Sequence, residues 1–104
     1  MKTFEAKIIG IVKLPTYRIK GKPGQRGKEL VLTLWRLTIS YLAKDEVYEI
    51  ELPEPLKKFS CTEYSLGTTG LADFDLFVTP PVNVGDRIQI DAYDPGERVR
   101  ADRD

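Results

Sequence analysis

The sequence predicts an all-β protein that folds as one small barrel of five strands. Apolar and polar residues alternate with period two along most of the chain, which is the pattern of strands with one buried face. β-branched and aromatic residues are frequent in the alternating segments, and this composition favours strands over helices. The 104 residues are the usual size of a single domain. We therefore expect one barrel over residues 1–93 and a charged, flexible tail over residues 94–104.

The first expected strand ends at Pro15. Apolar and charged residues alternate from Phe4 to Ile8, and the alternation then breaks at Gly10. A glycine at a change of phase within a strand predicts a bulge or a sharp coil.

The second expected strand is "ELVLTLWRLTISYLA", residues 29–43. The leucines before Trp35 share one phase, and the apolar phase then moves to Trp35, Leu37, Ile39 and Tyr41. Strands that change face bend and contribute to two sheet layers. The first two strands are both expected to bend in this way.

Three shorter strands are expected at residues 47–52, 73–79 and 87–93. A tight turn at 44–45 leads into the first of them. The connector 53–72 lacks strand alternation, and Pro55 is suited to begin a short helix. We expect this helix to run through Phe59 and Tyr64.

This order of elements resembles the OB-fold, a five-stranded Greek-key barrel whose strands coil strongly. Three strands, a short helical or irregular connector and two more strands are the shared features. The resemblance covers about residues 3–93, and "VGDRIQI" at 84–90 is similar to the turn that leads into the last OB-fold strand. An SH3-like barrel and a small β-sandwich remain alternatives. The resemblance implies that the loop between the first two strands contacts oligonucleotides.

That loop is strongly basic. The stretch "TYRIKGKPGQRGK", residues 16–28, holds five cations, three glycines, one proline and no acid. A flexible backbone lets several cations reach successive phosphates and release counterions. The alternative is an exposed loop that is charged only because it is solvated. The candidate phosphate contacts are Arg18, Lys20, Lys22, Arg26 and Lys28.

Aromatic residues near the loop could stack on bases, as proteins that bind single strands require. Tyr17 lies at the start of the loop, next to Arg18. Trp35 lies at the change of phase in the second strand, where it could be core or stacking platform. Arg36 follows it and is expected to support the loop cations.

The third strand argues against a binding site on its outer face. We expect its inward side chains to be Tyr48, Ile50 and Leu52. Glu49 and Glu51 would then point outward, on the face where OB-folds commonly bind nucleic acid, and would repel phosphates. The binding surface is therefore expected nearer the loop and Arg36.

Charge is distributed unevenly although the chain is neutral overall. Residues 1–44 carry ten basic and two acidic side chains, whereas residues 45–104 carry six basic and fourteen acidic ones. A basic half can bind a polyanion, and it can equally pair with an acidic half. The second possibility makes a protein-interaction module or a homodimer the alternative function.

The composition excludes several kinds of site. The chain has no histidine, and Cys61 is its only cysteine. An intramolecular disulfide, a Cys/His zinc site and a histidine base are therefore excluded. The pair Asp73 and Asp75 could bind Mg²⁺ or do acid–base chemistry, but solvated strands show the same pattern. We expect no enzyme activity, no metal and no cofactor.

The absence of a long apolar run leads us to expect a cytoplasmic protein with no membrane segment. Few Asn and Gln residues with many charged ones are typical of thermophile proteins. The function expected from the sequence is binding of single-stranded nucleic acid, DNA rather than RNA, with little sequence preference. The expected site residues are Tyr17, Arg18, Lys20, Lys22, Arg26, Lys28, Trp35 and Arg36.

Overall fold

The computed structural model describes residues 1–19, 30–43 and 46–98. Its main sheet consists of β1 (Lys2–Lys13), β4 (Trp35–Tyr41), β5 (Tyr48–Glu51), β6 (Ser65–Gly67), β7 (Leu71–Leu76) and β8 (Arg87–Tyr93). All neighbouring strands are antiparallel, in the order β6-β5-β8-β1-β4-β7. The predicted all-β class is confirmed.

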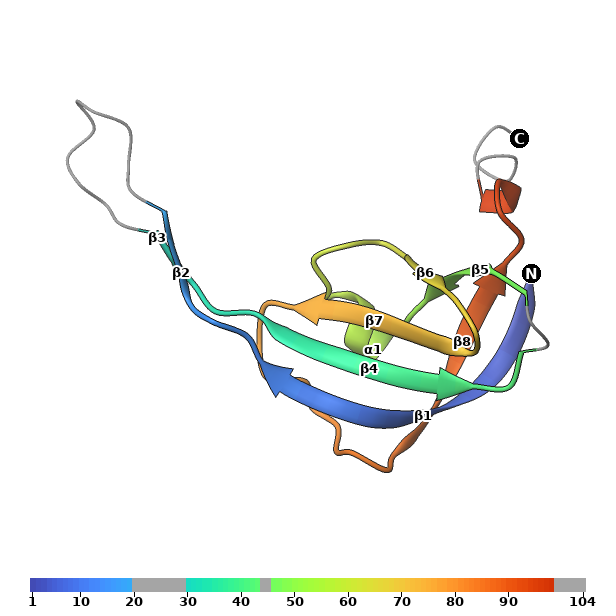
Figure 1. The fold of residues 1–104 in the computed structure, drawn as a ribbon, viewed down its shortest axis with the longest axis horizontal. Helices are drawn as coiled ribbons and strands as arrows, with labels where there is room; N and C mark the ends of the chain where they lie inside the picture. Colours follow the sequence, from blue (N-terminus) through green and yellow to red (C-terminus); the bar gives the residue numbers. More distant parts are fainter. Residues whose placement is uncertain (20–29, 44–45, 99–104) are drawn as a thin grey trace.

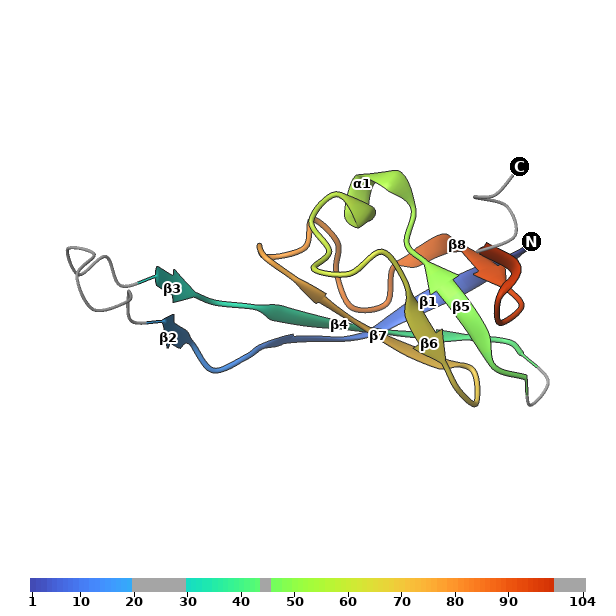
Figure 2. The same cartoon turned by 90° about the horizontal axis from the view of Figure 1, so that it is seen from above.

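The sheet curls into a nearly closed barrel, as Figures 1 and 2 show. The two outer strands, β6 and β7, follow each other in the chain and are joined by a tight turn. In that turn the amides of Thr68 and Leu71 each donate to the carbonyl of the other, both at 3.0 Å. The barrel therefore has six strands, one more than expected. The additional strand, β6, has three residues, which is too short for alternation to be recognised.

Strand β1 bends at the glycine, as predicted. Its pairing with β4 shifts register between Ile8 and Gly10, which is a bulge. Before the bulge β1 pairs with β8 from Lys2 to Lys7, and it pairs with β4 from Ala6 to Lys13. The bend thus lets one strand take part in both sides of the barrel.

The expected second strand is in fact two strands. Residues 30–32 form β3 (Leu30–Leu32), which pairs with β2 (Tyr17–Ile19) in a separate two-stranded sheet. The chain then leaves strand geometry at Thr33, whose side-chain oxygen lies 3.1 Å from that of Thr16, and re-enters it at Trp35. The change of apolar phase predicted at Trp35 marks this junction.

The core lies inside the barrel. Its least exposed large side chains include Ile8, Leu37, Ile39, Ile50, Leu56, Phe74, Leu76 and Ile90. The inward assignments of Tyr48, Ile50 and Leu52 are confirmed, as all three are buried. Strand β7 ends at Leu76, three residues before the expected end at residue 79, and Val78 beyond it is exposed.

The connector contains a helix of only one turn, α1 (Glu54–Lys57). Pro55 lies in its first turn, as predicted, but the helix does not extend through Phe59 and Tyr64. Leu56 is buried in the core. The chain then runs beside β7, where the Cys61 amide donates to the Asp75 carbonyl at 2.8 Å. Backbone pairing with β7 therefore replaces the expected helical turns.

Candidate functional site

The barrel extends a two-stranded arm, formed by β2 and β3. The arm projects beyond one end of the barrel in both views (Figures 1 and 2). Tyr17 is paired with Leu32 and Arg18 with Val31. Of the side chains that the structure describes, none on the arm belongs to the buried core. The arm is thus built as a surface feature.

Tyr17 and Arg18 both reach solvent on this arm. The Tyr17 side chain is 60% exposed, and Arg18 is exposed as well. Because successive residues of a strand point to opposite faces, the two side chains lie on opposite faces of the arm. The other four loop cations, Lys20, Lys22, Arg26 and Lys28, lie outside the described residues.

Trp35 and Arg36 lie at the base of the arm, in the first two positions of β4. Trp35 is half-buried and pairs in register with Lys13. The Arg36 side chain points to the outer face, where its Nε donates to Oδ1 of Asp75 at 3.1 Å. This hydrogen bond and the charge of Asp75 raise the pKa of Arg36. The structure therefore brings Arg36 to a carboxylate of its own chain.

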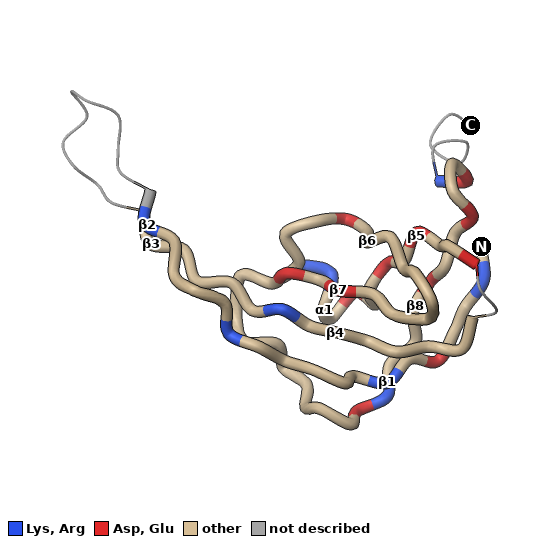
Figure 3. Tube along the Cα trace, viewed as in Figure 1, with Lys and Arg blue, Asp and Glu red and all other residues tan. Residues whose placement is uncertain are grey.

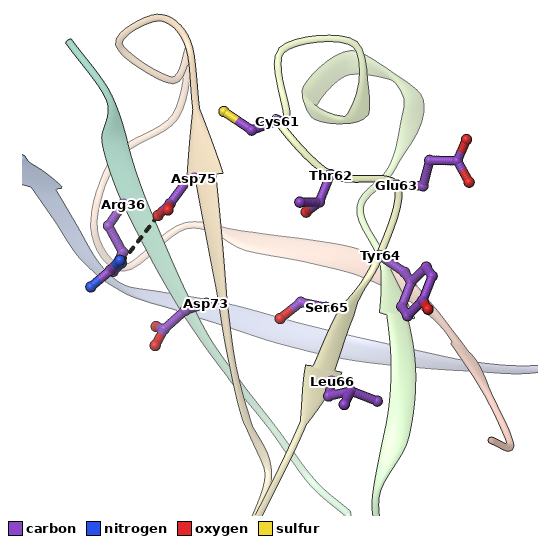
Figure 4. A pocket seen from close by; sticks show the side chains of 9 residues that line it. All are labelled: Arg36, Cys61, Thr62, Glu63, Tyr64, Ser65, Leu66, Asp73 and Asp75. Atoms are coloured by element: carbon purple, nitrogen blue, oxygen red, sulfur yellow. Dashed lines mark hydrogen bonds and ion pairs between the residues drawn. The ribbon is translucent and has the colours of Figure 1, made fainter. Parts of the chain in front are cut away.

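A groove of about 880 Å³ adjoins this ion pair. Strand β7 forms one wall with Asp73 and Asp75, and the segment 61–66 forms the other (Figure 4). Figure 4 shows Thr62 and Ser65 on the side facing β7, while Tyr64 points away from it. The sequence offered no sign of this groove, because neither the strand β6 nor the path of residues 61–66 beside β7 was expected.

The groove carries more acid than base. The Oδ1 atom of Asp73 accepts a hydrogen bond from Thr38 Oγ1 at 2.6 Å. Within residues 1–19, 30–43 and 46–98, no lysine or arginine forms an ion pair with Asp73. Glu63 adds a further carboxylate to the lining. The groove is therefore a poor surface for phosphates.

Cys61 also lines the groove. Burial, followed by the negative charge of Asp75, raises the pKa of its thiol. A raised pKa disfavours the nucleophilic thiolate. Cys61 is therefore suited to packing and not to nucleophilic catalysis.

Glu51 does not lie on an open outer face, as the sequence led us to expect. It is 8% exposed and forms ion pairs with Arg98 and, at 3.4 Å, with Lys57. The Arg98 guanidinium also stacks over Tyr64, 4.6 Å from the ring centroid. The strand pattern could not reveal this cover, because Arg98 lies 47 positions further along the chain.

A second hollow of about 500 Å³ lies near the start of β1 and β5. Its polar groups bind each other. Lys2 Nζ donates to Tyr48 Oη at 3.2 Å, and Tyr48 Oη donates to Glu46. Since these groups already have partners, the hollow offers few free polar contacts to a ligand.

No group of three or more Cys, Asp or Glu side chains in the described part of the chain is placed to hold a metal ion. The helix described here is too short and too polar to cross a membrane. Comparison with protein families, with curated proteins and with solved structures gave no match to this chain.

Proposed function

We propose that this protein is a non-catalytic module that binds single-stranded nucleic acid through its arm. The observation that carries the proposal is the placement of Tyr17 and Arg18 on an arm outside the barrel, both exposed to solvent. An aromatic ring beside cations is the combination that binds unpaired bases and their backbone. The arm joins the first two long strands, so the proposal retains the binding mode of an OB-like barrel.

The cations of the arm would contact phosphate. Arg18 is followed in the chain by Lys20, Lys22, Arg26 and Lys28, with no acid among them. Figure 3 shows further basic positions where the arm meets the barrel, and acidic positions on β7. A polyanion is therefore attracted to the arm and repelled from the groove.

Trp35 and Arg36 have supporting roles in this proposal. Arg36 is already paired with Asp75, so contact with a phosphate would compete with that carboxylate. Trp35 is half-buried and offers less ring surface than Tyr17. Substitution at either position should therefore weaken binding less than substitution on the arm.

Titration of a fluorescent oligodeoxythymidine of about 16 nucleotides tests the proposal. If the five loop cations each neutralise one phosphate, the log–log salt slope is about −3.5. Affinity should then fall about 100-fold between about 50 mM and 200 mM salt. Tyr17→Ala should cost about 1–3 kcal/mol of stacking free energy.

The triple variant Arg18→Ala, Lys20→Ala and Lys22→Ala should reduce the salt slope to about −1.4. Arg87→Ala is the matched control, because Arg87 is an exposed cation away from the arm, and it should bind as the parent does. Duplex DNA and single-stranded RNA of the same length test the choice of polymer. No binding at low salt, or binding that the triple variant leaves unchanged, would refute the proposal.

A further inference from the structure

The arm exposes more apolar surface than is usual for a two-stranded hairpin that packs on nothing. Tyr17, Leu30 and Val31 are 60%, 59% and 55% exposed. Leu30 and Val31 are adjacent in β3 and therefore lie on opposite faces of the arm. A two-stranded hairpin with both faces in water is marginally stable, and it normally packs on another element. The described part of the barrel supplies no such cover, because the arm projects away from it.

The aliphatic side chains indicate a protein partner for this surface. Leucine and valine contribute neither charge nor stacking to a nucleic acid. Contiguous exposed apolar residues instead mark contacts with proteins or membranes. Arg18 on the arm and Lys13 at the end of β1 are both exposed and add positive charge. The complementary surface should therefore be acidic and partly apolar.

The groove beside β7 is both acidic and partly apolar. Asp73 has no ion-pair partner among the described residues. Glu63 is 81% exposed and pairs with Arg98 at 3.6 Å. Leu66, which also lines the groove, is 60% exposed. Thr62, Glu63 and Asp73, which line the groove, are all exposed to solvent.

We propose that the arm of one molecule docks into the β7 groove of a second copy of this chain. Arg18 and Val31, which share one face of the arm, lie against the acidic wall that includes Asp73, and Leu30 on the opposite face covers the exposed apolar rim at Leu66. A reciprocal exchange of arms gives a closed dimer, whereas a one-way contact gives a ring or a filament. This contact requires no nucleic acid and does not rest on the proposed function. Because both use Arg18, oligonucleotide and second copy should compete for the arm.

Sedimentation of the full chain, freed of nucleic acid, measures its association state. The measurement is made at about 0.05 M and about 0.5 M salt, because salt screens exposed charges. We expect association that increases with protein concentration and decreases with salt. The variant Arg18→Glu with Val31→Ser, on the arm, should weaken association at least ten-fold. Asp73→Lys, in the groove, should do the same.

The decisive step mixes the two variants. Each lacks one half of the contact, so each should be monomeric alone, and a one-to-one complex should form when they are combined. Pairing between two arms would give no complex in this mixture. Asp73→Asn preserves the shape of the side chain and should weaken association in the same direction if Asp73→Lys does not fold.

The control variant is Arg87→Glu with Val84→Ser. These residues are an exposed cation and an exposed apolar side chain on and before β8, outside both surfaces. This variant should associate as the parent does. A monomer under all conditions, unchanged association of the arm variant, or a mixture without a complex would each overturn the proposal.

Discussion

Gly67 and Tyr41 show how closely one residue can depend on another inside this barrel. A Cβ atom at Gly67 would lie 2.0 Å from Tyr41 Oη and 3.0 Å from Ile50 Cγ1. The Tyr41 ring is held in the core, with its hydroxyl buried and without a hydrogen-bond partner among the described residues. Only glycine therefore fits where β6 passes over Tyr41.

Gly67→Ala should lower the free energy of unfolding by about 1–3 kcal/mol, the usual cost of overpacking a core. Urea denaturation measures this change. Gly10→Ala is the matched control, because its Cβ would lie 3.6 Å from the nearest atom, an ordinary contact. Adding Tyr41→Phe to Gly67→Ala removes the clashing oxygen and should restore part of the loss. Equal effects of the two alanine substitutions would contradict this account.

At the scale of the elements, the two short ones, β6 and α1, contribute to the barrel. The three residues of β6 form one edge of the nearly closed barrel, next to β7, and the single turn of α1 places Leu56 in the core. Residues 94–98, the described part of the segment after β8, also contact the barrel, although they lie within the tail that the sequence predicts to be flexible. Its Arg98 pairs with the buried Glu51 and stacks on Tyr64.

Arg98→Ala should lower stability by about 2–3 kcal/mol, because it leaves the Glu51 carboxylate buried with a weaker partner. Thermal unfolding is the measurement. Arg87→Ala removes another ion-paired arginine, but that pair with Glu5 is solvent-exposed, and such pairs contribute about 0–1 kcal/mol. A loss in Arg87→Ala as large as that in Arg98→Ala would show that burial of Glu51 is not the cause.

At the scale of the whole molecule, the two charge halves occupy different regions. Basic positions lie on β1 and the arm, whereas β7 and the segment before β6 carry acidic positions (Figure 3). The Arg36–Asp75 pair joins the two regions on the outside of the barrel. The neutral total therefore conceals basic positions on the arm and acidic positions on β7, which both proposals use.

Stability of the whole barrel should fall in alkaline solution. Burial raises the pKa of Tyr41, and the charge of Tyr48 adds to the shift. The folded state therefore keeps a proton that the unfolded chain loses near pH 10. This contribution is complete below pH 10 and is lost as pH rises through the folded pKa, by at most about 1.4 kcal/mol per pH unit.

Urea unfolding at several values between about pH 9 and pH 11 measures this dependence. Tyr41→Phe should make the stability fall less steeply, because the titrating hydroxyl is absent. Tyr17→Phe, which removes a hydroxyl from the arm, should retain the slope of the parent. An unchanged slope in Tyr41→Phe would refute the assignment.

Local patterns in the sequence determined much of this protein. Alternation predicted the all-β class and the buried residues of β4 and β5, because a pleated strand points every second side chain to one face. The break at Gly10 predicted the bulge in β1, and the composition excluded histidine chemistry. The basic stretch at residues 16–28, between the first two expected strands, predicted the candidate binding surface.

Only the tertiary structure decided which segments meet. It placed Arg98 over Glu51, Arg36 against Asp75, and the segment 61–66 opposite β7. Arg98 and Glu51 are 47 positions apart and Arg36 and Asp75 are 39 apart, so no local period encodes these two contacts. It also separated the arm from the barrel, which the alternation had merged into one long strand. The physical reason is that the alternation of apolar and polar residues shows which face of a strand is buried. Which other segments pack on that face depends on the topology of the whole chain.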